Sequence, residues 1–422
     1  MDSLYFDYNA TTPIEPSVLQ AISTTLENAW GNPSSKAPAG QKAKAIIQAA
    51  RIKVAEMINA KNSDDIVFTS GGTESNNLVF HTVLHENLLS TSPVTLPHVI
   101  ISAIEHPATI LPLEHLAAAN RCTFTLLPIR PTGDVDPEEV RLQLRQETVL
   151  VSVMLANNET GVVSDLKRIV EVVREWEDEK CREDGAREAG KRTRVFVHTD
   201  AAQAIGKIEV DVQDLGIDYL TIVGHKFYGP RIGALYARHP GVATPIHPMF
   251  FGGGQERGFR PGTENTGMIA GLGEASHLVV ARLHTISVHY RNLIAHFETQ
   301  IRVRAPLGFG AVIHGEGANR IPNTCNFSVV RVGADTEGAT TAMALVKRLL
   351  EKGVTVGKGA ACHTGVDGPS ATLLAMQVPP VIARSAIRFS VGRETKVEDV
   401  DRVVALIWET VLEVLGDAAT AK

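Results

Sequence analysis

The chain has 422 residues, of which 44% are hydrophobic, and it carries a formal net charge of -6. This length and composition allow a large buried core divided into two or more compact units, and they exclude a disordered or fibrous protein. The negative charge provides no basic field for a phosphate backbone, so we expect a small-molecule partner rather than nucleic acid.

The N-terminal segment from Met1 to Asn9 contains Asp2 and Asp7 but no lysine or arginine, and no apolar stretch follows it. It therefore resembles neither a secretory signal nor an arginine-rich transit peptide. No apolar run approaches the roughly 18 residues of a membrane span. These features favour a cytoplasmic protein without a membrane segment.

Between Ile66 and Tyr236, short β-rich runs alternate with helical patterns, which predicts a mostly parallel sheet covered by helices. Asp136 before Pro137 indicates a helix start, and so does Ser164 before an apolar periodic pattern. The charged stretch from Glu175 to Arg194 lacks an apolar face and is interpreted as a solvated helix end and loop. The predicted strands are Ile66 to Ser70, Val99 to Ala103, Thr123 to Leu127, Val149 to Leu155, Val195 to Thr199, Tyr219 to Val223 and Gly233 to Ala237.

A second, smaller α+β domain is expected after the Gly- and Pro-rich stretch from Thr244 to Gly267. We predict three parts of the chain: residues 1–14 associated with the small domain, 15–280 forming the large domain, and 281–422 forming the small domain. A long helix from about Met268 to Val303 is predicted to bridge the two domains. The small domain's predicted elements are a strand near Thr324 to Val330, a helix near Thr336 to Lys352, a strand at Ala386 to Ser390 and a terminal helix from Val397.

The cysteines lie far apart and form no CxxC pair, so neither a metal site nor a disulfide framework is predicted. Cys362 lies in a glycine-rich segment beside His363 and close to Lys358, where basic neighbours favour a reactive thiolate. Free cysteines are usually buried and inert; Cys122 and Cys325 lie in apolar strand-like runs, and Cys181 lies in the charged stretch.

Two polar segments follow predicted strands at the edge where α/β sheets bind ligands. Ser70-Gly71-Gly72-Thr73 closes one strand and opens a helix, so free amides and a hydroxyl favour an anion there, although an ordinary βα turn is an alternative. Asp200 follows another strand and is suited to pair with a protonated ring nitrogen, although helix capping is its commoner role.

Lys226, His106 and Arg388 complete the pattern. Lys226 lies just past a strand, where a solvated lysine is the ordinary outcome, but burial and a cationic partner such as His225 would lower its pKa and make it a Schiff-base nucleophile. His106 is suited to stack on a ring and move protons, or is a polar loop residue. Arg388 is suited to bind a substrate carboxylate, or to form a structural ion pair.

Pyridoxal 5′-phosphate (PLP) requires a lysine for its aldehyde, an anion for its pyridine nitrogen, donors for its phosphate and a group against its ring. The chain offers a candidate for each requirement, nearly all of them at strand ends. Each candidate is weak alone, and their convergence predicts a PLP enzyme with its cofactor bound to Lys226.

These segments resemble the class V aminotransferase family, in particular the cysteine desulfurases and selenocysteine lyases. The resemblance runs from Tyr5-Phe6-Asp7-Tyr8-Asn9-Ala10-Thr11-Thr12-Pro13 to Arg388-Phe389-Ser390-Val391-Gly392-Arg393. The stretches from Thr221 to Tyr236, Arg260 to Thr266 and Gly359 to His363 are most similar to selenocysteine lyases. The resemblance implies PLP fold type I, an α/β fold with a seven-stranded, mostly parallel sheet in the large domain.

The resemblance also implies roles for individual residues. Lys226 and Cys362 correspond to catalytic residues, His106 stacks on the ring, Arg388 binds the substrate carboxylate, and Asn32 borders the substrate. The implied cofactor-binding residues are Gly72, Thr73, His106, Asn158, Asp200, Gln203, His225, Lys226 and Thr263.

In the family, the segment Arg260-Pro261-Gly262-Thr263 reaches the neighbouring subunit's site, which implies a homodimer. The chain departs from many bacterial desulfurases at Val223, where they carry a phosphate-binding Ser or Thr, so its phosphate binding is expected to be weaker or differently shared.

The expected reaction converts L-selenocysteine, or L-cysteine, to L-alanine and reduced selenium or sulfur. Three alternatives remain open: a cysteine desulfurase that passes sulfur from Cys362 to an acceptor protein, another class V reaction, and an inactive scaffold on the same fold. The sequence does not distinguish the two chalcogens.

Overall fold

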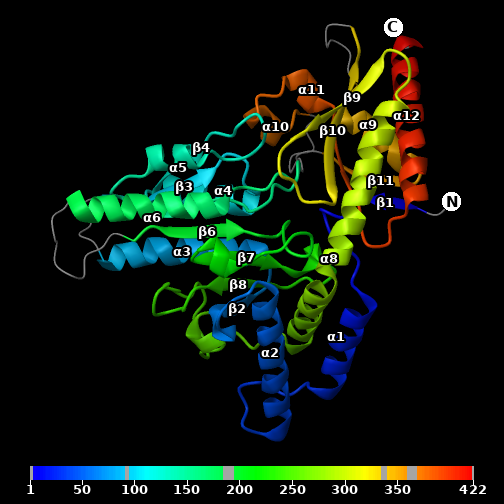
Figure 1. Ribbon diagram of the computed structural model, residues 1–422. Helices are drawn as coiled ribbons and strands as arrows, with labels where there is room; N and C mark the ends of the chain where they lie inside the picture. Colours follow the sequence, from blue (N-terminus) through cyan, green and yellow to red (C-terminus); the bar gives the residue numbers. More distant parts are fainter. Residues whose placement is uncertain (1–2, 91–94, 184–193, 334–339, 359–367, 421–422) are drawn as a thin grey trace.

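The computed structural model describes residues 3–90, 95–183, 194–333, 340–358 and 368–420, and two β-sheets organise this part of the chain. Figure 1 shows the larger sheet among helices α2 to α7, with the smaller sheet beside the long helix α8 and the terminal helix α12. Both ends of the chain lie near the smaller sheet.

The larger sheet has seven strands in the order β2-β8-β7-β6-β5-β3-β4. β8 is antiparallel to both β2 and β7, and the other pairs are parallel, so the predicted fold class is confirmed. β5 ends three residues before the predicted end, and β6 includes Asp200 as its last residue. The strands are β2 (Ile66–Thr69), β3 (His98–Ser102), β4 (Thr123–Leu127), β5 (Thr148–Ser152), β6 (Phe196–Asp200), β7 (Tyr219–Val223) and β8 (Gly233–Ala237).

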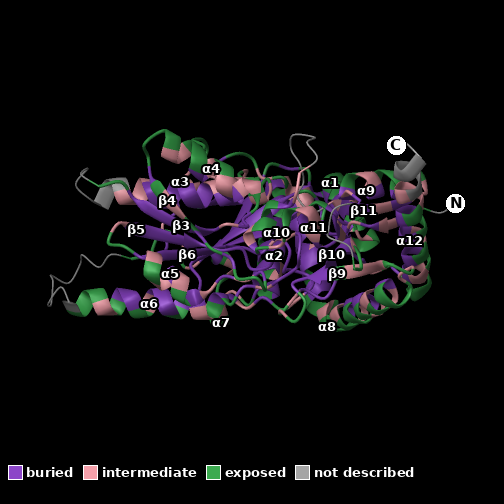
Figure 2. Cartoon of the chain, turned by 90° about the horizontal axis from the view of Figure 1, so that it is seen from above, coloured by how far each residue is buried: buried purple, intermediate pink, exposed green. Residues whose placement is uncertain are grey.

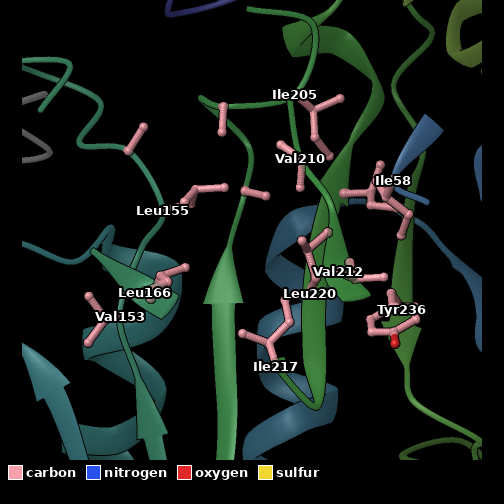
Figure 3. Close-up of a cluster of buried hydrophobic side chains, with 14 of the residues drawn as sticks. Ile58, Val153, Leu155, Leu166, Ile205, Val210, Val212, Ile217, Leu220 and Tyr236 are labelled. Atoms are coloured by element: carbon pink, nitrogen blue, oxygen red, sulfur yellow. The ribbon is translucent and has the colours of Figure 1, made fainter. Parts of the chain in front are cut away.

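Helices cover both faces of this sheet, and for that reason its central strands are buried along their whole length (Figure 2). Successive residues of a strand point to opposite faces: Tyr219 packs in one hydrophobic cluster, and Leu220 in another. Figure 3 shows Leu220 in the second of these clusters, together with Val153 and Leu166. The covering helices are α2 (Pro38–Met57), α3 (Gly72–Ser90), α4 (Pro107–Ala118), α5 (Pro137–Gln143), α6 (Leu166–Glu183) and α7 (Val212–Leu215).

Both predicted helix starts exist, but one cap differs from the prediction. The Asp136 carboxylate accepts the Glu138 amide at 3.0 Å, as predicted. At α6 the cap is Asp165, which accepts the Arg168 amide at 3.2 Å, because the Ser164 hydroxyl instead donates to the Met154 carbonyl.

The prediction of a solvated helix end from Glu175 was partly wrong. α6 continues to Glu183 and buries Trp176 and Glu177 in its charged part. Glu177 is buried because its carboxylate accepts the Val195 amide at 2.6 Å, and Arg174 pairs with it at 3.1 Å.

The smaller sheet has five strands in the order β1-β11-β12-β10-β9. Sequence analysis found β10 and β12 but missed the other three. The predicted helix from Thr336 begins only at Ala342, after the capping residue Thr341, and residues 334–339 lie outside the described part. The strands are β1 (Leu4–Phe6), β9 (Phe309–His314), β10 (Thr324–Arg331), β11 (Val354–Lys358) and β12 (Ala386–Ser390); the remaining helices are α1 (Pro16–Asn28), α8 (Thr266–Val303), α9 (Ala342–Glu351), α10 (Ala371–Ala375), α11 (Pro380–Arg384) and α12 (Val397–Thr420).

The long helix α8 belongs to both halves of the molecule. Its residues up to Val279 pack in the core of the larger sheet, and those from Ile286 onward pack in the core of the smaller sheet. Leu4 and Phe6 of β1 also pack in the second core. These contacts support our proposed domain division near residue 280, with the N-terminal segment joined to the small domain. Among the described helices, none has the length and apolar character needed to cross a membrane.

Candidate active site

A cavity of about 560 Å³ lies at the carboxyl ends of the central strands, where the two sheets approach each other. It brings together nine of the residues predicted from the sequence: Gly72, Thr73, His106, Asn158, Asp200, Gln203, His225, Lys226 and Arg388. A more open cleft of about 1030 Å³ lies beside α6 and α7 and contains none of the predicted site residues. The smaller cavity is therefore the candidate active site.

Lys226 ends the short 3-10 helix η2 (Gly224–Lys226) that follows β7. Its amine donates to the carbonyls of Asn9 and Ala10, each at 2.8 Å. Burial lowers the pKa of this amine to about 8, and the nearby Arg388 guanidinium adds to the effect. The side chain thus carries a partly buried amine that loses its proton close to neutral pH.

His225 does not act on Lys226 in the way the sequence suggested. Burial lowers the pKa of His225 to about 4, and the charge of Lys226 lowers it further, so its imidazole is neutral near pH 7. The prediction that His225 is the cationic partner of Lys226 was therefore wrong, and the positive charge near Lys226 comes from Arg388 instead. His225 Nδ1 lies 3.0 Å from the Thr11 hydroxyl.

Asp200 is held by side chains of the larger sheet and of α3. Its Oδ2 accepts from Asn76 Nδ2 at 3.0 Å, and its Oδ1 accepts the Ala202 amide at 2.9 Å. Asn76 in turn accepts from the Thr221 hydroxyl at 2.6 Å. This chain of hydrogen bonds fixes the orientation of a carboxylate that is only 8% exposed.

The start of α3 lies against the end of β7. A Cβ atom on Gly72 would stand 2.6 Å from Val223 Cγ2, so a larger residue at position 72 would collide with that side chain. Gly72 and Thr73 line the cavity at the amino end of the helix, where free amides and the helix dipole favour an anion.

His106 is the N-cap of α4, and its Nδ1 accepts the Ala108 amide at 3.1 Å. Because Nδ1 acts as an acceptor, a neutral ring carries its proton on Nε2. The side chain lines the cavity beside Asp200 and Lys226. Its position is compatible with a ring-stacking role.

Arg388, on β12, extends from the smaller sheet into the cavity. It donates to the Asn158 carbonyl at 2.9 Å and to Asp7 Oδ1 at 2.7 Å, while its buried Nε has no hydrogen-bond partner among the described residues. Gln203 donates to the Asn9 carbonyl at 3.0 Å and accepts from the buried Lys207 amine at 2.8 Å.

Two predicted residues, Asn32 and Thr263, do not line this cavity, and a third, Cys362, is not described. Asn32 is exposed, and its Oδ1 accepts the Ser34 amide at 2.9 Å. Thr263 is exposed on the single chain. Cys362 lies within residues 359–367, outside the described part, together with the neighbouring His363.

Sequence analysis did not assign roles to Asn9, Glu105, Asp7 and Lys207. Asn9 and Asp7 belong to the N-terminal motif, and Glu105 directly precedes His106, so the motifs contained a signal for these three; Lys207 has no comparable signal. Burial raises the pKa of Glu105 to about 8, although Oε1 accepts from the Ser102 hydroxyl at 2.6 Å and from the Met154 amide at 2.7 Å.

The residues around the cavity fit PLP. Helix amides and a hydroxyl suit its phosphate, the Asp200 carboxylate suits its pyridine nitrogen, and the Lys226 amine suits its aldehyde. The buried, unpartnered Arg388 Nε and Glu105 Oε2 also point to a polar ligand in this cavity. No group of three or more metal-ligating side chains able to hold a metal ion occurs among the described residues.

Comparisons with known proteins identify the family of the chain. The sequence model described as aminotransferase class V matches residues 4–403. Selenocysteine lyase from Rattus norvegicus is 46% identical, over 98% of this chain and 95% of the relative, and the cysteine desulfurase IscS of Dictyoglomus turgidum is 36% identical, over 98% and 95%. The solved structure of a NifS-like protein superposes with a TM-score of 0.81 at 29% identity, covering 96% of this chain and 98% of that protein.

Proposed function

Because the chain belongs to the class V aminotransferase family, whose members use PLP, we propose that it cleaves L-selenocysteine to L-alanine and zero-valent selenium, which an external thiol reductant converts to reduced selenium. The carrying observation is the greater similarity to selenocysteine lyases, at 46% identity, than to cysteine desulfurases, at 36%, over nearly the whole chain. The family assignment confirms the expected cofactor. L-cysteine is the second substrate to test.

In this proposal the cavity binds PLP with its phosphate at the start of α3, near Gly72 and Thr73, and its ring between His106 and Asp200. Asn158, Gln203 and His225 supply further polar contacts. When bound, PLP acts as an electron sink that stabilises negative charge on the substrate's α-carbon. Asp200 favours a protonated ring nitrogen because its carboxylate is buried and fixed by Asn76.

The substrate's carboxylate is proposed to bind Arg388, whose Nε is unpartnered among the described residues. Lys226 then removes the α-proton once its amine is free. With a pKa of about 8, a useful fraction of this amine is unprotonated near neutral pH, as a general base requires.

Cys362 is proposed to act at the chalcogen in one of two ways. As an acid it would protonate the β-carbon while the carbon–selenium bond breaks and neutral selenium leaves. As a nucleophile its thiolate would bond to the sulfur while the carbon–sulfur bond breaks and the electron pair of that bond stays on the β-carbon, which takes up a proton to give alanine. In a cysteine desulfurase it would carry sulfur as a persulfide to an acceptor protein. Alanine release should distinguish the two: a strong preference for L-selenocysteine supports the lyase, and comparable rates with L-cysteine support the desulfurase.

We further propose a cytoplasmic homodimer. Asn32 and Thr263 lie outside the cavity of the single chain. In this proposal, Thr263 lies near the phosphate in the neighbouring subunit and Asn32 borders the substrate site, as the family resemblance implies. A mixed dimer of one Lys226→Ala chain and one Thr263→Ala chain tests whether Thr263 serves the neighbouring subunit. In that case one of its two sites has both an intact Lys226 and an intact Thr263, and activity returns.

The central test is the visible absorption of the purified protein together with alanine formation. Lys226→Ala should lose the absorption of lysine-bound PLP and all turnover. Cys362→Ala should keep the absorption and lose turnover of at least one substrate. An unchanged spectrum in Lys226→Ala would refute the cofactor assignment, and full activity of Cys362→Ala on both substrates would refute the role of Cys362.

A further inference from the structure

The loop after β8 contacts the first turn of α3, next to the proposed phosphate site. Arg260 Nε donates to Glu74 Oε1 at 2.7 Å, and Arg260 Nη2 donates to Glu74 Oε2 at 3.2 Å. Glu74 Oε2 also accepts the Ser70 amide at 2.8 Å. The Glu74 side chain is only 8% exposed, so this is a largely buried, two-point contact.

Glu74 stabilises the turn before α3, but its negative charge lies where it would weaken the binding of an anion. Its bond to the Ser70 amide fixes the turn Ser70-Gly71-Gly72, in the manner of a glutamate in a capping box. The same carboxylate directly follows Thr73, in the helical turn whose amides would bind a phosphate. An unpaired negative charge there would repel the phosphate.

Glu74 remains charged in the folded protein. Burial alone would raise its pKa, but the hydrogen bonds from Arg260 and Ser70 outweigh burial and hold the pKa below its ordinary value. Its charge is therefore balanced by the guanidinium rather than removed by a proton.

The loop that carries Arg260 is itself anchored. Arg51 and Glu256 form an ion pair at 2.6 Å with side chains only 5% and 2% exposed, and Glu256 Oε2 also accepts the Phe68 amide at 2.8 Å. Arg257 donates to the carbonyls of Asp64 and Ile66 at 3.0 and 2.9 Å. These contacts hold the loop against β2, so the backbone that carries Arg260 has a fixed position relative to Glu74.

We propose that Arg260 is a positioning residue for the cofactor's phosphate. It holds the Glu74 carboxylate in the conformation that fixes the turn Ser70-Gly71-Gly72, and it cancels the charge that would otherwise oppose the phosphate at the start of α3. This inference rests on the proposed function, because it assumes that PLP binds in the described cavity. Arg260 acts here through Glu74 of its own chain, whereas Thr263 is proposed to contact the phosphate in the neighbouring subunit's site.

The experiment measures dissociation constants of the apoprotein for PLP and for pyridoxal, which lacks the phosphate, by equilibrium dialysis. We expect Arg260→Gln to weaken PLP binding about tenfold, the effect of a partly buried charge near a helix end. Its pyridoxal binding should change less than about twofold, because pyridoxal lacks the repelled group. Arg348→Gln, an exposed arginine of α9 paired with Glu351 and Glu413, controls for the change in net charge.

The decisive variant is the double substitution Glu74→Gln with Arg260→Gln. It removes both charges and should restore PLP affinity to within about threefold of wild type, which loss of a merely structural contact would not do. Arg260→Lys keeps the charge without the two-point geometry, and should bind PLP more tightly than Arg260→Gln.

Unchanged PLP affinity in Arg260→Gln would overturn the inference. Equal weakening of PLP and pyridoxal, or a double variant no better than Arg260→Gln, would also overturn it, because each result indicates general disruption of the loop. Failure of the wild-type protein to bind either compound would instead overturn the proposed function, and this inference with it.

Discussion

Glu105→Gln tests whether a buried carboxyl beside the cofactor site is neutral in the folded protein. Burial raises the pKa of Glu105 from 4.5 to about 8, and the nearby Asp200 adds to this rise. Glu105 and Asp200 both line the candidate active site. Glutamine has the same shape and can accept the same two hydrogen bonds from Ser102 and Met154.

The expected magnitude follows from proton linkage. Between pH 4.5 and 8 the folded chain binds the Glu105 proton more tightly than the unfolded chain does. The contribution of this proton to the free energy of unfolding is therefore complete below pH 4.5 and is lost as the pH rises toward 8. Each pH unit within this window changes the free energy of unfolding by about 1.4 kcal/mol. From pH 5 to 7 the stability of wild type should fall by roughly 3 kcal/mol relative to Glu105→Gln, as an upper bound.

Urea unfolding of the apoprotein at pH 5, 6 and 7 measures this difference. Glu27→Gln, which changes an exposed carboxylate on α1, should follow the pH dependence of wild type. If the stabilities of wild type and Glu105→Gln remain parallel from pH 5 to 7, Glu105 is ionised in the folded state and the reasoning fails.

Other substitutions test the contacts of the site. Arg388→Lys should raise the KM for the amino acid about tenfold or more with a smaller change in kcat, because one amine cannot replace a guanidinium that already binds Asp7; steady-state kinetics measure this. Val223→Thr should tighten PLP binding about threefold in equilibrium dialysis, by adding a hydroxyl beside Gly72. Lys207→Met should raise stability at pH 7 in urea unfolding, because burial holds the pKa of Lys207 well below its ordinary value. The unfolded chain binds the Lys207 proton more tightly than the folded chain does, so the gain should shrink as the pH approaches about 10.

The strands that position the site were predictable because their residue pattern is local. The runs around β7 and β8 are continuously apolar or β-branched, and both strands have the predicted bounds. β1 and β11 were missed, since they are short and pair with each other across 350 residues of sequence, from Leu4 to Val354. Such pairing leaves no periodic signal within a local window.

The site shows the same division between local and distant information. Lys226 and Asp200 were recognisable because each lies at a strand end, where ligands bind in α/β folds. The neutral state of His225 was not recognisable, because it depends on burial and on the charges around it in the folded chain. The partners of Arg388 were likewise hidden, because Asp7 lies 381 residues away in sequence.

Asn9 connects the two domains, because its hydrogen bonds reach residues of both. Its carbonyl accepts from Lys226 at 2.8 Å and from Gln203 at 3.0 Å, both in the larger domain. Its side chain donates to Thr324 at 2.8 Å and accepts from Asn323 at 3.1 Å, both at the start of β10. The smaller sheet thereby determines where the Lys226 amine is held, so a displacement of that sheet would alter both the position of the amine and its pKa. The second domain is therefore part of the lysine's environment as well as the source of Arg388.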